Sequence, residues 1–364
     1  MAKAVWPAKA DWLRCAAAIV LLAAAAAAAA PAGAQTKAQI EGCTQEYNSL
    51  AIAEQRTRSP DARIADCTVV IKSGRWSGSE LAWAYANRGN AYLEKNDYDR
   101  AIVDFSEAIE RDPQSARGHN GRGIAYQRKG DYDHSIEDFD RALAIDPKFH
   151  WAYNTRCVSF RLKGDLDRAL RDCNQALVLE PRFAAGYLSR ANVYLAQKEF
   201  DRAIADLDQL LAIDPKFSDG YVKRGDAYEA RKDYGHAIAD YDQAIALDPK
   251  DAGVYNARCW ARVLSGADLP DALADCDESL RLAPGDPNTF NSRGLVYLKL
   301  GGFRQAIDDY GAAIAKDERD ADSLYGRGVA RQKSGDAAGG DADLAAARAI
   351  KADIADVFAG YGVK

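Results

Sequence analysis

Residues 116–149 read ARGHNGRGIAYQRKGDYDHSIEDFDRALAIDPKF, and residues 184–217 read AAGYLSRANVYLAQKEFDRAIADLDQLLAIDPKF. The two stretches have the same length, and small, aromatic and charged residues occupy matching places in both. A recurring unit of this length indicates supersecondary elements stacked along the chain, each burying its apolar face against the next. The fold therefore follows from this unit and from its copies on both sides.

Counted from Ala82, the unit recurs every 34 residues, and one extra residue near Pro270 lengthens the sixth copy. The eight copies span residues 82–115, 116–149, 150–183, 184–217, 218–251, 252–286, 287–320 and 321–354. Position 4 is bulky, positions 8 and 20 are small, and position 11 is mostly aromatic. Their helical spacing predicts two amphipathic helices per copy. Pro at position 32 of the first six copies ends the second helix.

This pattern resembles the tetratricopeptide repeat (TPR) family over residues 82–354. The resemblance implies an all-α, right-handed superhelical solenoid of eight helix-turn-helix repeats. In that family an inner groove, lined by the first helix of each repeat, holds peptides. Residues 35–81 look like a degenerate half repeat that caps the N-terminal end. Residues 355–364 carry apolar side chains at helical spacing, and we expect them to form the C-terminal cap that solenoid ends require.

The first 34 residues differ from the rest of the chain. Lys3, Lys9 and Arg14 precede a run of mostly Ala over residues 15–30, and Ala32-Gly33-Ala34 follows. A basic start, a short apolar run and an A-x-A site are the layout of a secretory signal peptide. We expect cleavage after Ala34 and a secreted or periplasmic protein with no membrane span after cleavage.

Composition and motifs argue against several functions. The net charge of −6 disfavours nucleic acid, whose binding requires clustered Lys and Arg. The sequence has no zinc-protease, nucleophile-elbow, phosphate-loop or C-x-x-C motif. The four His residues, at positions 119, 134, 150 and 236, do not have the spacing of metal ligands. We therefore expect no enzyme activity, no metal and no cofactor.

Two charged columns are invariant along the repeats. Position 7 is always Arg, at residues 88, 122, 156, 190, 224, 258, 293 and 327. Position 23 is always Asp, at residues 104, 138, 172, 206, 240, 275, 309 and 343, after allowance for the extra residue in repeat six. Because the guanidinium fork suits a carboxylate, we favour structural Arg–Asp pairs over an Arg ladder for an anionic ligand. Pairing within a repeat and pairing with the adjacent repeat both remain open.

The resemblance places positions 2, 5, 6, 9, 12 and 13 of each first helix in the groove. Trp and Asn recur there, and both suit peptide binding, Trp through apolar area and Asn through its paired donor and acceptor. The candidate protein-binding residues are Trp83, Asn87, Asn90, Asn120, Trp151, Asn154, Asn192, Lys223, Asn256, Trp260 and Asn291. A family-type clamp of Lys and Asn on a peptide carboxylate is not supported, since only Lys223 lies at a plausible position.

Six Cys follow the signal segment, an even number suited to an oxidising compartment. Cys157 and Cys173 occupy positions 8 and 24 of repeat three. Cys259 and Cys276 occupy the same positions of repeat six, after allowance for its extra residue. Antiparallel helices joined by a turn bring positions 8 and 24 opposite each other. We therefore predict disulfides within these pairs, although helix axes usually pack too far apart for a bridge. Cys43 and Cys67 would form the third pair.

The sequence thus favours an extracytoplasmic scaffold or adaptor that holds a partner protein or an extended peptide. The alternative is a structural or assembly protein of the cell envelope that acts through oligomerisation. The repeats do not reveal the oligomeric state, the partner or the pathway.

Overall fold

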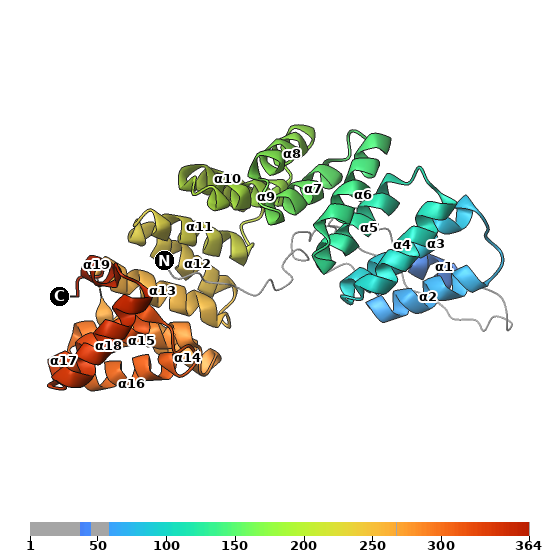
Figure 1. Cartoon of the computed structure of the whole chain (residues 1–364). Coiled ribbons are helices and arrows are strands. Elements are labelled where there is room, and N and C mark those ends of the chain that lie inside the picture. The colour runs from blue at the N-terminus through green and yellow to red at the C-terminus, as the bar shows by residue number, and fades with distance from the viewer. Residues whose placement is uncertain (1–36, 45–57, 267, 364) are drawn as a thin grey trace. The chain divides into compact units, whose positions relative to one another are not determined.

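The computed structural model describes residues 37–44, 58–266 and 268–363, and every regular element in those residues is a helix (Figure 1). The expected signal peptide, residues 1–34, lies outside the described residues. The chain divides into two compact units, the first ending at Pro215 and the second starting at Lys216.

The helices come in the expected pairs, two to a repeat. The first unit contains α1 (Lys37–Thr44), α2 (Pro60–Lys72), α3 (Ser79–Glu94), α4 (Tyr98–Arg111), α5 (Ala116–Lys129), α6 (Tyr132–Ile145), α7 (His150–Leu162), α8 (Leu166–Leu179), α9 (Ala184–Ala196) and α10 (Phe200–Ile213). The second unit contains α11 (Ser218–Ala230), α12 (Tyr234–Leu247), α13 (Ala252–Ser265), α14 (Leu269–Leu282), α15 (Pro287–Leu300), α16 (Phe303–Ile314), α17 (Ala321–Ser334), α18 (Ala337–Ile350) and α19 (Ile354–Gly360). The described chain is therefore an all-α solenoid of helix pairs.

The turn inside each repeat is built from local chemistry. In repeat two, Gly130 closes α5 in the left-handed region at φ 83°, which costs glycine little. Asp131 then accepts a hydrogen bond from the backbone N–H of His134 and caps α6. The same aspartate cap recurs at Asp97, Asp165 and Asp233. The polar turn predicted from the sequence is therefore a helix stop followed by a helix start.

The two helices of a repeat approach closely where position 8 is small. A Cβ atom on Gly123 would lie 2.6 Å from the Phe139 ring, closer than real Cβ contacts. One on Gly121 would lie 2.4 Å from Phe105 of the preceding repeat. Each large residue at position 24 therefore lies between two repeats, and a methyl group at either glycine would require the ring to move.

The Arg and Asp columns pair within each repeat. All eight Arg side chains donate from Nε and Nη2 to the Asp of their own repeat, at 2.5–3.0 Å. In repeats one to four, six and seven, Nη1 also donates to a polar side chain in the preceding second helix, for example from Arg190 to Asn174 at 2.7 Å. One guanidinium thus joins three helices, which supports the structural interpretation of the columns.

Local variations within these pairs change their electrostatics. Burial raises the pKa of Asp172, even though Arg156 is its hydrogen-bond donor. The pKa of Asp138, in contrast, lies below its usual value. Burial alone would raise it, but hydrogen bonds from Arg122 and His119 outweigh that effect. His119, an exception in the aromatic column at position 4, therefore serves as a further donor to the pair.

Candidate protein-binding site

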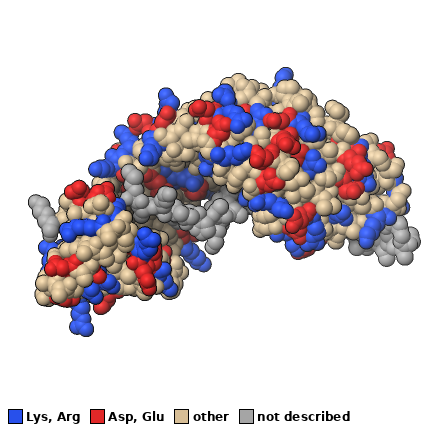
Figure 2. Space-filling view, viewed as in Figure 1, with Lys and Arg blue, Asp and Glu red and all other residues tan. Residues whose placement is uncertain are grey.

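Within each unit, first helices of neighbouring repeats contact one another, and the face that they form is called the inner face. In the first unit α3, α5, α7 and α9 are in contact in this order. In the second unit α13 contacts α15, and α15 contacts α17. Over the visible surface, basic and acidic side chains are interspersed without a large field of one sign (Figure 2).

Helix α7 carries three buried side-chain atoms without hydrogen-bond partners, two on Asn154 and one on Arg161, and α9 carries another, the Oγ atom of Ser189. Asn154 is fully buried, and neither its Oδ1 nor its Nδ2 has a hydrogen-bond partner. The Nε atom of Arg161 is likewise buried without a partner, and burial lowers the pKa of its guanidinium. Buried polar groups are normally paired, so each of these groups is destabilising in the free chain.

The neighbours of Asn154 in the same helix are satisfied. Thr155 donates to the Oδ1 atom of Asn120 at 3.0 Å, and Gln127 donates to Ser159 at 2.7 Å. These bonds join α5 to α7 and complete the local network without using the Asn154 amide. The unpaired amide is therefore a property of this position and not of the whole helix face.

Trp151 begins the same face of α7, three residues before Asn154. Its ring meets Phe183 edge-on, with the ring centroids 4.4 Å apart, and it stays partly exposed. Trp151, Asn154 and Arg161 therefore place an aromatic ring, an unpaired amide and an unpaired guanidinium along one helix. Arg161 was not among the predicted groove residues, although its charge at position 12, where repeats one and four carry Leu, indicated an unusual group on this face.

The other expected groove residues of the first unit have varied surroundings. The Nδ2 atom of Asn87 donates to the backbone oxygen of Cys43 at 2.8 Å, so this side chain holds α1 in place. Asn120 is buried and accepts the hydrogen bond from Thr155, so it is not the open groove residue that was expected. Trp83 packs edge-on against Trp76, while Asn90 and Asn192 are partly exposed.

The expected groove residues of the second unit are mostly engaged. The Nδ2 atom of Asn291 donates to Ser323 of the next first helix at 2.7 Å, and Lys223 lies 3.6 Å from the Asp219 carboxylate. Trp260 packs against Tyr361. Only Asn256 keeps a buried and unpaired atom, its Oδ1. The second unit therefore offers fewer free groups than α7 does.

The six cysteines form three pairs in the structure. Cys157 is bonded to Cys173 and Cys259 to Cys276, with Cα–Cα distances of 5.5 and 5.6 Å. Cys43 is bonded to Cys67, with the Cα atoms 4.8 Å apart. The side chain at position 8 is small, and here it is the cysteine itself. The two helices can therefore approach to the distance that a disulfide requires, closer than helix axes usually pack. The disulfides fix the N-terminal region and repeats three and six.

Two further properties concern the described residues alone. No cluster of three or more His, Cys, Asp or Glu side chains there could hold a metal ion. None of the helices formed by those residues is long and apolar enough to cross a bilayer.

Comparisons agree with this architecture. The tetratricopeptide repeat model matches residues 87–148, 160–216, 190–252 and 291–354, more than half of the chain. The chain therefore belongs to the tetratricopeptide repeat family, whose members generally mediate protein–protein interactions and bind peptides. Comparison with curated proteins found no match.

Solved structures show the same fold at low sequence identity. A tetratricopeptide repeat protein from Parabacteroides merdae has a TM-score of 0.51 and 18% identity, covering 68% of this chain and 97% of its own. PilF of Pseudomonas aeruginosa has a TM-score of 0.51 and 20% identity, with 57% and 94% covered. Part of a repeat protein from Cytophaga hutchinsonii has a TM-score of 0.52 and 16% identity, with 65% and 97% covered.

Proposed function

We propose that this protein is a scaffold that holds an extended segment of a partner protein on the inner face of its first unit, centred on α7. The observation that carries the proposal is the row of Trp151, Asn154 and Arg161 on α7, where a partly exposed ring lies beside a buried, unpaired amide and an unpaired guanidinium nitrogen. The Asn154 amide is fully buried in the free chain, so a bound segment reaches it once the side chains that cover it move aside. A peptide backbone offers one acceptor and one donor, which an Asn side chain can satisfy together. Binding would thereby relieve a cost that the free chain carries.

Arg161 suggests the chemistry of the bound segment. No carboxylate among the described residues forms an ion pair with it, whereas each Arg of the position 7 column has its Asp. A guanidinium with one desolvated face is best satisfied by a carboxylate, through charge-assisted hydrogen bonds. The partner segment is therefore acidic, with an aromatic or aliphatic side chain placed against Trp151.

We propose further that the protein works outside the cytoplasm. The support is the basic start, the apolar run and the Ala32-Gly33-Ala34 site of the sequence, together with three paired cysteines. Disulfides persist in oxidising compartments and are rare in the cytosol.

One substitution, Asn154→Leu, should change the stability of the chain and its binding of peptides in opposite directions. We expect Asn154→Leu to raise the free energy of unfolding by about 1 kcal/mol, because it removes two buried polar atoms that have no partner. The same change should weaken binding of peptides selected from a random library on the unsubstituted protein. Urea denaturation and fluorescence anisotropy measure the two effects. Loss of stability with unchanged peptide affinity contradicts the proposal.

Substitution of Arg161 tests whether the bound segment is acidic. Peptides selected on the unsubstituted protein should be enriched in Asp and Glu, and Arg161→Gln should remove that enrichment and weaken selected peptides by about tenfold or more. Arg182 is an exposed Arg in the turn before α9, so Arg182→Gln is a control with the same charge change. Equal losses in both variants would indicate a general charge effect and no site on α7.

A further inference from the structure

The C-terminal helix α19 ends in a turn that folds the chain back on itself. Gly362 has φ 78°, in the left-handed region, and the N–H of Val363 donates to the backbone oxygen of Phe358 at 3.0 Å. This is the hydrogen bond of a Schellman turn, and it brings the last apolar residue against the helix. Ile354, Phe358 and Val363 are all buried.

This segment extends beyond the last repeat. Phe358 lies 4.7 Å from Tyr325 of α17, ring to ring, as a cap on the last repeat requires. Tyr361, however, meets Trp260 of α13 edge-on at 5.3 Å, and α13 belongs to repeat six. Burial raises the pKa of Tyr361 to about 12. Residues 354–363 therefore lie across the inner face of repeats six to eight.

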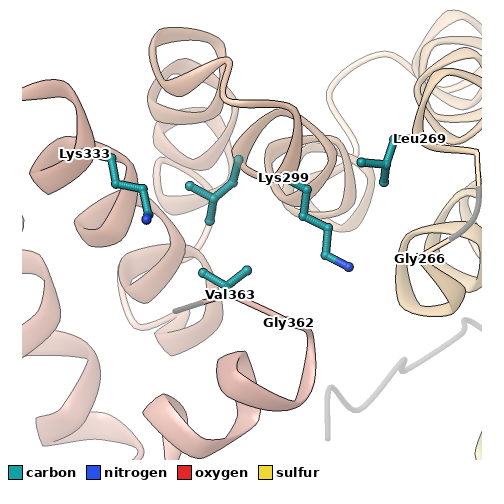
Figure 3. Close-up of a pocket in the computed structure, with 7 residues that line it drawn as sticks. Gly266, Leu269, Lys299, Lys333, Gly362 and Val363 are labelled. Carbon is teal, nitrogen blue, oxygen red and sulfur yellow. The ribbon is translucent and has the colours of Figure 1, made fainter.

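Val363 occupies the space between two first helices. Lys299 and Lys333, from α15 and α17, lie on either side of it in Figure 3. Together with Leu269 and Leu298 these residues surround a cavity of about 360 Å³. The Nζ atom of Lys299 donates to the backbone oxygen of Val263 at 2.7 Å, which holds its chain against the wall of the cavity.

We infer that residues 354–363 are an internal ligand, which occupies the inner face of repeats six to eight until a partner segment displaces it. The inference rests on the proposed function in one respect, that the inner faces bind protein segments. The displacing segment has the chemistry of the internal one, a short helix with two aromatic residues three positions apart, like Phe358 and Tyr361. A tethered segment competes at millimolar effective concentration, so it keeps weak binders out.

The experiment supplies the segment from outside. The probe is a fluorescein-labelled synthetic peptide, ADIADVFAGYGV, with the sequence of residues 352–363. The full chain with Phe358→Ala and Tyr361→Ala should bind it at least about tenfold more tightly than the unsubstituted chain, because the weakened tether no longer competes. Adding Trp260→Ala should abolish this binding. Asp356 is exposed on α19, so Asp356→Ala should behave like the unsubstituted chain.

Two outcomes overturn the inference. If the double variant keeps its helical content and does not bind the peptide, the segment is only a cap. If the double variant unfolds, hydrogen exchange of residues 354–363 is compared between the unsubstituted chain and Trp260→Ala. Faster exchange in that variant supports the inference, and unchanged exchange overturns it. Selected peptides bound at α7 report on the first unit separately, so failure of either site is distinguishable from failure of the other.

Discussion

Asp206→Ala is expected to lower the free energy of unfolding by about 3 kcal/mol. Asp206 is 5% exposed and accepts two hydrogen bonds from Arg190, at 2.7 and 2.8 Å. Removing the carboxylate leaves a largely buried guanidinium with only its bond to Asn174. Breaking a buried pair in this way is far more costly than losing a surface ion pair.

A double-mutant cycle isolates the pair itself. Arg190→Met combined with Asp206→Leu should cost less than the sum of the single changes, with a coupling of at least about 1.5 kcal/mol. Urea unfolding measures the free energy of unfolding of each variant. The dependence of that free energy on urea concentration is also compared, because repeats can unfold separately. Asp167, exposed in α8, provides the control Asp167→Ala with little expected effect. Additive effects at residues 190 and 206 would contradict the pairing.

Removal of the Cys157–Cys173 bridge is the second large effect, with an expected loss of about 3 kcal/mol in the chain-entropy model for a loop of this length. In protein purified from its own compartment, all six cysteines should resist alkylation until a reductant is added. Thermal unfolding with and without reductant measures the contribution of the three bridges together.

The repeats themselves provide a control that separates cross-linking from packing. Repeat two has Gly123 and Phe139 at the places that Cys157 and Cys173 occupy in repeat three. Cys157→Gly with Cys173→Phe therefore restores the apolar contact without the bond, whereas Ala at both places also leaves a void. We expect the Ala pair to be the less stable of the two. Equal stability of the Gly–Phe variant and the unsubstituted oxidised chain would mean that the bridge adds nothing beyond packing.

The regular part of the structure was predictable because it repeats. Position 8 is small in every copy, and that column indicates close helix approach and the register in which Cys157 faces Cys173. The Arg–Asp pairing followed from two matched columns, but the third bond of Arg190 to Asn174 did not, since position 25 varies in chemistry. Arg262 shows the same limit. It replaces an aromatic residue and donates to Asp275 at 2.6 Å, as Arg331 does to Asp343 in repeat eight, whereas the aromatic column at position 11 predicts apolar packing.

The candidate site was predictable only in outline. Spacing placed Asn154 on the groove side of α7, but its burial depends on how closely neighbouring first helices approach. The contact of Tyr361 with Trp260 joins residues 101 positions apart in the sequence, and it depends on the curvature of the second unit. Neither the approach of neighbouring first helices nor the curvature of the second unit can be read from a 34-residue period. The sequence therefore identified the helix face without identifying which of its residues are free to bind.

The most direct measurement of the central claim is site-specific photocrosslinking in the native compartment. A photoreactive residue is placed at Leu162, 42% exposed at the end of α7, or at Val178, 71% exposed on the second helix α8. Binding at the inner face of the first unit predicts a discrete adduct from position 162 that disappears when Asn154→Leu is added, and none from position 178. An adduct from position 178 alone, or one from 162 that survives Asn154→Leu, contradicts it.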